Sequence, residues 1–353
     1  MQVSIIIKAL NEERNIARAI ESALAALPDG NGEVILADSG STDHTLDIAA
    51  RYPIAIVQLT RPEDRGCGTG PQLGYQYSSG DFVCLIDGDM ALDRGFFAAA
   101  LATFAEHAEV AGIAGFVREM NVANLEFRRR MLARTSDLDA GEVDRLSGGG
   151  IYRRSAVEAA GYLSDRNLHG HEEYDLGLRL RSSGFKLLRL DRPFVDHYGH
   201  AGDAYGLLWR RWKTRYLCGV GEVLRAAAGT PHLWTLVREL RELHLWLAVY
   251  AWVFLILGLA LFAPTTAIAV AGIAFLVSLP VLTMSFRRNS LELGLYSVVA
   301  WLLHAAGTAR GFFHPRIPPT QWIESRVVQH TPPKNQPRAN GVDPRTSLSG
   351  MPS

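Results

Sequence analysis

Two aspartates, Asp87 and Asp89, stand one residue apart directly after the apolar run 82–86. Two carboxylates at this spacing can share a hard divalent cation, which prefers oxygen ligands and keeps coordination positions open for phosphate oxygens. The D-x-D pattern by itself is common in surface turns, so its meaning depends on the position of the preceding strand. At the carboxyl end of a central strand, the pair would form a candidate metal and phosphate site.

A second group of carboxylates, Glu172, Glu173 and Asp175, stands at the start of a helix that the residue pattern predicts over 173–183. One carboxylate of such a group could accept the proton of an attacking hydroxyl, as general-base catalysis requires. The helix dipole also stabilises acidic side chains in a first turn, so the same residues have a structural explanation. Both explanations can hold at once.

Further polar residues gather at 38–43, directly after the run 33–37, and around His197. Asp43 fits a helix cap and a ligand contact equally well. Asp38 ends the strand itself, a position that favours ligand binding over a simple turn. His197 follows a predicted strand, where an ordinary loop histidine is the common finding.

These groups need a shared scaffold, and the spacing of apolar residues predicts one. Short apolar runs alternate with helical patterns, which indicates the α/β class: a mostly parallel sheet with helices on both faces. Because ligands bind at the carboxyl ends of the strands in such sheets, residues 8–12, 38–43 and 87–89 are expected around one crevice. The strands are predicted at 3–7, 33–37, 54–59, 82–86, 151–153 and 186–190, and the helices at 11–27, 45–52, 72–79, 124–138, 156–160 and 173–183.

The composition argues against one class of partner and indicates a membrane. Lys plus Arg equal Asp plus Glu at 36 each, so no global charge favours nucleic acid. Residues 243–262 and 266–285 are apolar and long enough to cross a bilayer, whereas residues 293–309 either cross it or lie at its surface. Arg287 and Arg288, after the second segment, place the N-terminal domain on the cytosolic side by the positive-inside rule.

The remaining segments complete the expected organisation. Residues 205–228, with Arg211 and Trp212, have the pattern of an amphipathic interfacial helix. Residues 229–242 lead to the membrane, and residues 314–353 are polar, proline-rich and expected to be disordered. The three cysteines lack metal or disulfide spacing, which suits a reducing compartment.

Four blocks of this sequence resemble family 2 glycosyltransferases, inverting enzymes with the GT-A fold. They are VSIIIKALNEERNI at 3–16, DSGSTDHTL at 38–46, GDFVCLIDGDM at 80–90, and GGGIYRRS through HEEYDLGLRLR at 148–181. Their order and spacing match over residues 1–200, which is more specific than any single block. The chain is thus identified as a membrane-anchored, bacterial-type member whose GT-A domain covers residues 1–228.

The resemblance implies contacts with a nucleotide-sugar donor, a UDP- or GDP-sugar. The nucleobase edge would meet Asp38, and three glycines would leave room for the sugar or the acceptor. Arg211 and Trp212 fall on a degenerate Gln-x-x-Arg-Trp element with Leu208 in place of Gln, and an interfacial helix is the preferred interpretation there. The donor contacts so implied are Ala9, Glu12, Asp38, Asp87, Gly148, Gly149, Gly150, Arg211 and Trp212.

The resemblance also implies a divalent metal and a catalytic base. Asp89, with Asp87, would hold Mg²⁺ or Mn²⁺ across the diphosphate, and some members use a histidine in the region of His197 as a further ligand. The cation would offset charge on the departing nucleoside diphosphate. The base would be the second residue of an acidic pair, here Glu173.

Glutamate stands at position 173 where aspartate is commoner in the family, so Glu172 and Asp175 stay as alternatives for the base.

The implied reaction moves a sugar to a lipid-linked or glycan hydroxyl at the cytosolic membrane face, in cell-surface polysaccharide or glycolipid synthesis. The nearest alternative is a polyprenyl-phosphate sugar synthase, whose phosphate acceptor needs no strong base. A non-catalytic nucleotide-binding subunit of a membrane complex would be expected to have lost these carboxylates, and they are present. The expected partners are a nucleotide sugar, that acceptor and membrane lipids.

Overall fold

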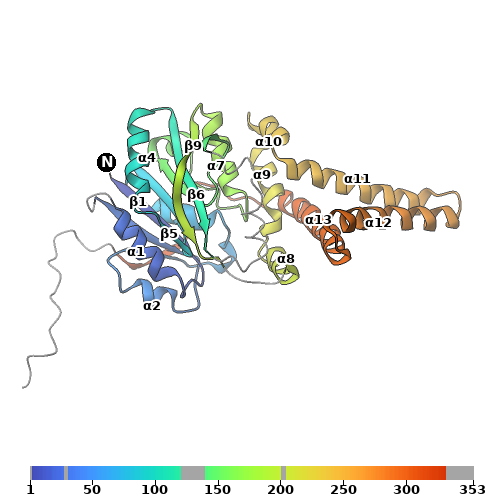
Figure 1. Ribbon diagram of the computed structural model, residues 1–353, viewed down its shortest axis with the longest axis horizontal. Coiled ribbons are helices and arrows are strands. Elements are labelled where there is room, and N and C mark those ends of the chain that lie inside the picture. Colours follow the sequence, from blue (N-terminus) through green and yellow to red (C-terminus); the bar gives the residue numbers. More distant parts are fainter. Residues whose placement is uncertain (1, 28–30, 121–139, 200–203, 331–353) are drawn as a thin grey trace, which may run out of the picture.

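The structure is a computed structural model that describes residues 2–27, 31–120, 140–199 and 204–330. The helix expected at 124–138 lies outside these residues. The described residues form one sheet of ten strands, in the order β10-β3-β2-β1-β4-β8-β6-β9-β5 with β7 beside β9. Helices cover both faces of this sheet, and a long helical extension projects from one end of the body (Figure 1). The expected α/β class is therefore confirmed.

The first half of the sheet follows the sequence pattern closely. β1 (Val3–Ala9) lies between β2 (Gly32–Asp38) and β4 (Phe82–Asp87), β3 (Ala55–Leu59) lies beside β2, and all four run parallel. Their central residues are apolar because both faces of a parallel sheet are covered. The carboxyl ends of β1, β2 and β4 consequently meet at one edge.

The second half of the sheet is mixed. β8 (Gly150–Arg153) runs antiparallel to β4 and to β6 (Val110–Glu119). β6 is parallel to β9 (Lys186–His197), and two short strands, β5 (Met90–Leu92) and β7 (Gly141–Val143), pair antiparallel with β9. The alternation of strands and helices in the sequence predicts parallel strands. It therefore accounts for the first half of the sheet but not for β8, which is antiparallel to both of its neighbours.

Two hydrophobic clusters hold the helices to opposite faces of the sheet. Ile5 and Ile7 of β1 belong to one cluster and Ile6 to the other, as the two-residue period of a strand requires. The first cluster includes side chains of α1 (Ile16–Ala26), α2 (Thr45–Ala49) and α4 (Phe96–Glu106). The second includes side chains of α3 (Thr69–Gln76), α6 (Arg154–Ala159) and α7 (Glu172–Ser182).

The prediction of a single amphipathic helix over 205–228 is wrong. The segment forms α8 (Ala204–Lys213), the short 3-10 helix η4 (Tyr216–Cys218) and α9 (Gly219–Ala227). The break occurs at Arg215, whose φ of 63° lies in the left-handed region and cannot continue a right-handed helix. α9 is followed by α10 (Leu233–Glu239).

Three further helices, α11 (Arg241–Phe262), α12 (Thr266–Arg288) and α13 (Leu291–Phe312), are each long and apolar enough to cross a membrane. α11 and α12 form a hairpin that projects away from the body (Figure 1). α13 instead packs against α9 and η4 with backbone in contact. A Cβ at Gly311 would lie 2.2 Å from the carbonyl oxygen of Cys218, so only glycine allows this approach.

Residues 314–330 do not follow the expectation of a disordered tail. β10 (Ser325–Gln329) pairs antiparallel with β3 and forms one edge of the sheet. Ile323, just before it, is fully buried in the second hydrophobic cluster. The composition of the segment is polar, but a short strand with one buried anchor can be held by an edge that would otherwise expose unpaired backbone groups.

Candidate active site

The carboxyl ends of β1 and β4, with Ser39 just after β2, line a cavity of about 640 Å³, a size typical of sites for small molecules. Four of the residues that the sequence singled out line this cavity: Ala9, Glu12, Asp87 and Asp89. A much smaller cavity of about 20 Å³ adjoins it, with Glu172, Glu173 and Gly149 in its wall. The sequence-predicted carboxylates are thus divided between two neighbouring spaces.

Lys8 joins the two cavities, because it lines both of them. Its Nζ atom lies 3.0 Å from Oδ1 of Asp87 and 3.5 Å from Oε1 of Glu172. Burial opposes the charged ammonium group, but the attraction of Asp87, Glu172 and Glu173 raises its pKa well above the usual value. Sequence reasoning placed Lys8 at the crevice and gave it no role.

Glu173 is held at the inner end of the site by the glycine-rich turn. The backbone N–H groups of Gly148 and Gly149 each donate to Oε1 of Glu173 at 3.1 Å. Gly149 has a φ of +89°, and a Cβ there would lie 2.2 Å from the carbonyl oxygen of Leu85. The glycines therefore allow the turn that positions Glu173, a contact that the sequence did not predict. Of the three, only Gly149 lines a cavity.

The environment of Glu173 suits a proton acceptor. Burial and the neighbouring Glu172 carboxylate raise its pKa to about 7, although Lys8 and the N–H of Gly149 oppose that rise. A base is most effective when its pKa lies near the working pH. Glu173 therefore has the proton affinity that a general base would need.

Asp175, the third carboxylate of the run, is not placed for catalysis. It lines neither cavity, and its Oδ2 atom accepts a hydrogen bond of 2.8 Å from Arg179 one turn later on α7. Both side chains are buried, and Arg179 also donates to the carbonyl oxygen of Tyr162 at 2.7 Å. Asp175 thus anchors the loop before α7, and it is corrected here from a catalytic candidate to a structural residue.

Asp89 and His197 lie together, as the metal hypothesis requires. Nε2 of His197 is 3.2 Å from Oδ2 of Asp89, and Nδ1 is 2.6 Å from Oε2 of Glu119. Although burial opposes the charged imidazole, hydrogen bonds to Asp89 and Glu119 raise the pKa of His197 to about 10. A histidine whose second nitrogen bonds a carboxylate is the usual arrangement for a metal ligand.

This donor set fits a hard divalent cation in part. The carboxylate of Asp89 suits Mn²⁺ or Mg²⁺, whereas the imidazole of His197 is a softer ligand than Mg²⁺ prefers. Glu119 would fix the orientation of that imidazole. Among the residues that the structure describes there is no preformed group of three or more His, Cys, Asp or Glu side chains able to hold a metal. Phosphate oxygens of a ligand would have to complete the coordination.

Asp38 does not line the cavity, contrary to the expectation that it meets the nucleobase. Its carboxylate is fully buried and accepts hydrogen bonds from the N–H groups of Gly40 and Ser41, each at 2.9 Å, and from Gln58 at 2.8 Å. It therefore shapes the turn that carries Ser39 into the cavity wall. Asp43 bonds the backbone N–H of Thr45 at 3.0 Å, at the start of α2.

Arg211 and Trp212 also lie off the cavity wall. The Arg211 guanidinium stacks over the Tyr216 ring at 5.3 Å, and Arg310 stacks over Trp212 at 5.3 Å. The cavity is lined instead by the residues that follow them: Lys213, Thr214, Arg215 and Tyr216. Three of these residues, Thr214, Arg215 and Tyr216, lie beyond the end of α8 at Lys213.

Two further cavity residues were missed because their partners are distant in sequence. Arg65 donates to the carbonyl oxygen of Ser39 at 2.8 Å and thereby fixes the turn after β2. His169 lines the cavity, and its Nδ1 atom lies 2.8 Å from the fully buried carboxylate of Glu222. Neither position carries a local motif that could have revealed it.

Comparisons with known proteins point to one family of enzymes. The pattern described as Glycosyl transferase family 2 matches residues 4–161. A low-salt glycan biosynthesis hexosyltransferase of Haloferax volcanii is 37% identical over 93 residues, 26% of this chain and 22% of that protein. A dolichol-phosphate mannosyltransferase of Pyrococcus furiosus is 23% identical over 138 residues, 38% of this chain and 39% of that protein.

The likeness of fold extends over most of the chain. A mannosyltransferase from Pyrobaculum calidifontis, solved with GDP-Man and Mn²⁺, superposes with a TM-score of 0.56 at 16% identity, covering 88% of this chain and 87% of that one. The two curated sequence relatives, in contrast, are matched over less than two fifths of their own length. The sequence likeness thus resides in the domain that carries the cavity.

Proposed function

From the match of residues 4–161 to glycosyl transferase family 2 and from the GT-A fold of the chain, we propose that this protein transfers a sugar from a nucleotide-sugar donor to an acceptor hydroxyl with inversion. The observation that carries the proposal is Glu173, a partly buried carboxylate with a pKa raised to about 7, beside a cavity whose wall includes Asp87 and Asp89. The donor fills the larger cavity, and the acceptor hydroxyl meets Glu173.

In the proposed reaction the acceptor oxygen attacks the anomeric carbon of the sugar while Glu173 takes the hydroxyl proton. The new bond joins that carbon to the acceptor oxygen, and the bond to the phosphate oxygen breaks with its electron pair staying on the nucleoside diphosphate. A divalent cation at Asp89 and His197, when bound, would offset the charge of the diphosphate. Lys8 holds Asp87 and Glu172 in place at the junction of the two cavities.

One observation favours a second candidate, transfer to a polyprenyl phosphate. The Pyrococcus relative is named a dolichol-phosphate mannosyltransferase, and a phosphate acceptor needs no deprotonation. The dependence of the rate on Glu173 separates the two reactions. The donor is proposed to be a UDP- or GDP-sugar, the latter in line with the GDP-Man found in the Pyrobaculum structure.

The apolar helices support a membrane anchor, and we propose that the catalytic domain lies on the cytosolic face. The loop between α11 and α12 (263–265) is uncharged, whereas Arg287 and Arg288 end α12 on the side of the catalytic domain. Positive residues favour the cytosolic side. The site would then face cytosolic nucleotide sugars and acceptors at the membrane surface.

The experiment that tests the function is a donor screen with the purified full chain in detergent. Release of nucleoside diphosphate is measured for UDP- and GDP-sugars with Mn²⁺ or Mg²⁺, with and without lipid-linked acceptors. We expect one donor class to be turned over, and Glu173→Gln to suppress the acceptor-dependent part. If no donor is turned over under any of these conditions, the proposal is wrong.

A further inference from the structure

We propose that residues 315–329, which follow the apolar helices, form a brace: they pack against the loops that line the donor cavity and hold those loops in place. Because the brace returns the chain to the catalytic domain after α13, only α11 and α12 cross the membrane. The cavity's role as the donor site rests on the proposed function, whereas the membrane arrangement does not. The inference starts from contacts that link three segments far apart in the sequence: the tail, the loop 60–70 and the loop 163–169.

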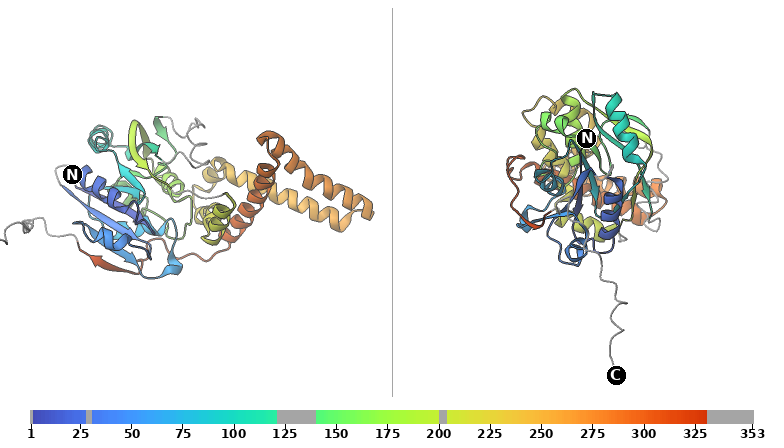
Figure 2. Two further views of the ribbon diagram at one scale, coloured as in Figure 1. Left: turned by 60° about the horizontal axis from the view of Figure 1, so that its bottom comes forward. Right: turned by 90° about the vertical axis from the view of Figure 1, so that its left-hand side faces the viewer.

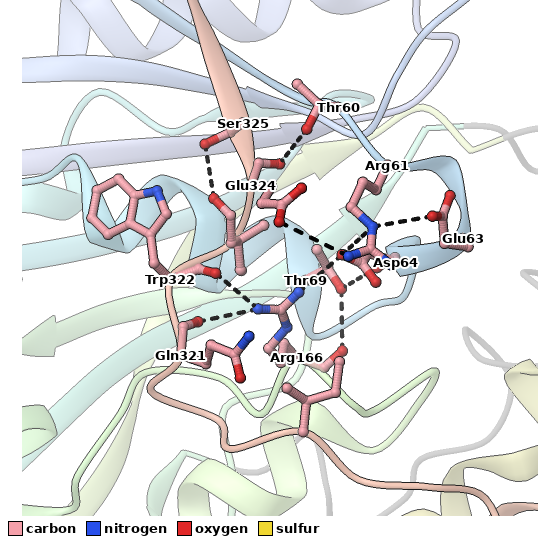
Figure 3. A network of polar contacts seen from close by, with 12 residues as sticks. Thr60, Arg61, Glu63, Asp64, Thr69, Arg166, Gln321, Trp322, Glu324 and Ser325 are labelled. Atoms are coloured by element: carbon pink, nitrogen blue, oxygen red, sulfur yellow. Dashed lines mark hydrogen bonds and ion pairs between the residues drawn. The ribbon is translucent and has the colours of Figure 1, made fainter.

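Arg166 is the centre of this contact (Figure 3). Its Nη1 atom donates to the carbonyl oxygens of Gln321 and Trp322 at 3.1 and 3.2 Å, and its Nη2 atom lies 3.0 Å from Oδ2 of Asp64. Only 5% of the Arg166 side chain is exposed. A buried guanidinium with these partners holds the tail backbone against the loop that contains Asp64.

The loops 60–70 and 163–169 are also bonded directly to each other. The Thr69 hydroxyl donates to the carbonyl oxygens of Asp64 and Arg166, at 2.6 and 3.2 Å. A Cβ at Gly68 would lie 2.0 Å from the carbonyl oxygen of Asp165, so the two backbones touch. The same loops supply part of the cavity wall: Pro62, Glu63, Arg65, Gly66, Cys67 and His169. Arg166 is accordingly a positioning residue for the donor site.

The brace begins directly after α13. Arg316, four residues beyond the end of that helix, lies 2.8 Å from Oδ2 of Asp165, a fully buried carboxylate. Asn167 and Ile317 exchange two hydrogen bonds of 2.8 Å. Farther along, β10 pairs with β3, as described above. The last turn of α13 is thus fixed to the catalytic domain, on the same side of the membrane as that domain.

The position of α13 agrees with this arrangement. The left view of Figure 2 shows α13 lying across the base of the α11–α12 hairpin rather than alongside it. Its His304 ring stacks on Trp246, in the second turn of α11, with ring centroids 5.0 Å apart. The most apolar 18-residue stretch of α13 has a mean hydropathy of 1.2, against 2.4 and 2.3 for α11 and α12, and a third of that stretch is buried in the protein. α13 is thus less apolar than the two hairpin helices and more covered by the rest of the chain.

The membrane arrangement is tested by cysteine labelling in sealed vesicles of both orientations, with a membrane-impermeant maleimide. Thr320→Cys reports the tail, Pro264→Cys the hairpin loop and Arg51→Cys the catalytic domain, and the unmodified chain gives the background of native cysteines. We expect the first and third positions to react in the same vesicles and Pro264→Cys in the others. Labelling of Thr320→Cys together with Pro264→Cys would overturn the proposal.

The brace is tested on the full chain by Arg166→Met, with Arg166→Lys as the conservative variant and Arg51→Met as an exposed control. Loss of the buried guanidinium contacts should raise the KM for the donor about tenfold, with a smaller change in kcat. Arg166→Lys keeps the positive charge, so its KM should lie between those of the native chain and Arg166→Met. An unchanged donor KM in a folded Arg166→Met protein overturns the brace. Thermal unfolding establishes folding, and UDP or GDP binding by calorimetry replaces KM if no donor is turned over.

Discussion

The ammonium group of Lys8 lies 3.0 Å from the carboxylate of Asp87, at the junction between the large cavity and the small one. This places a fixed positive charge beside the first aspartate of the D-x-D pair, where the donor phosphates are proposed to lie. The same ammonium group lowers the proton affinity of Glu173. A single side chain thus links the electrostatics of the donor end to those of the base.

We predict that Lys8→Met shifts the pH dependence of catalysis. Without the ammonium group the pKa of Glu173 rises above about 7, so a smaller fraction of the carboxylate is ionised at neutral pH. The acid limb of kcat/KM should move to higher pH, whereas Lys8→Arg should keep it near its original position. A profile for Lys8→Met that overlays the native one would show that Lys8 does not act on the base.

We predict that Glu173→Gln lowers transfer by about 10²–10⁴-fold, the usual value of general-base assistance. Donor binding should change little, because the donor is proposed to occupy the neighbouring cavity. Glu172→Gln is the matched control, since it removes an adjacent carboxylate that contacts Lys8 instead. Both variants are compared by initial rates and by donor affinity. Unaltered transfer in Glu173→Gln would favour the phosphate acceptor.

The raised pKa of Glu173 also predicts a stability effect. A carboxyl group whose pKa is higher in the folded chain stabilises it below pH 4.5 and loses that contribution as pH rises through about 7. At about 1.4 kcal/mol per pH unit, Glu173→Gln should gain up to about 3 kcal/mol relative to the native chain between pH 4.5 and 8. Denaturant unfolding at both pH values measures this. Equal differences at the two pH values would mean that Glu173 titrates normally.

Asp175→Asn should behave in the opposite way to Glu173→Gln. It leaves the buried Arg179 without its carboxylate partner, and such a loss typically costs about 3–5 kcal/mol. We therefore expect a marked drop in the free energy of unfolding with kcat of the remaining folded enzyme nearly unchanged. A stable but inactive Asp175→Asn would return this residue to the list of candidate bases.

Asp89→Asn and His197→Gln should both weaken metal dependence. If these side chains hold the cation, each variant should require at least about 10–100-fold more Mn²⁺ for half-maximal rate, which is the usual cost of losing even an outer-shell partner of a metal ligand. Binding of Mn²⁺ is followed independently by calorimetry in the presence of UDP or GDP. Full activity of the native chain in EDTA would remove the metal from the mechanism.

The parallel half of the sheet could be predicted because strands buried on both faces leave long apolar runs, as at Ile5–Ile7. The roles of Glu173 and Asp175 could not be separated in the same way. The two residues are neighbours in sequence, yet the turn of a helix points them to a cavity and to Arg179 respectively. Likewise Arg215 has no sequence signal for its left-handed conformation, so the helix break that lines the cavity was not foreseen.

The pairing of β10 with β3 has a consequence for how the protein is made. Gln58 of β3 and its partner Arg326 are separated by 268 positions, and the apolar helices are translated between them. At about 5–20 residues per second, the edge of the nascent sheet waits on the order of tens of seconds for its last strand. If residues 315–329 support the large cavity as proposed, that cavity is completed only after α11 and α12 have been synthesised, so a chain that ends before β10 should not form it fully.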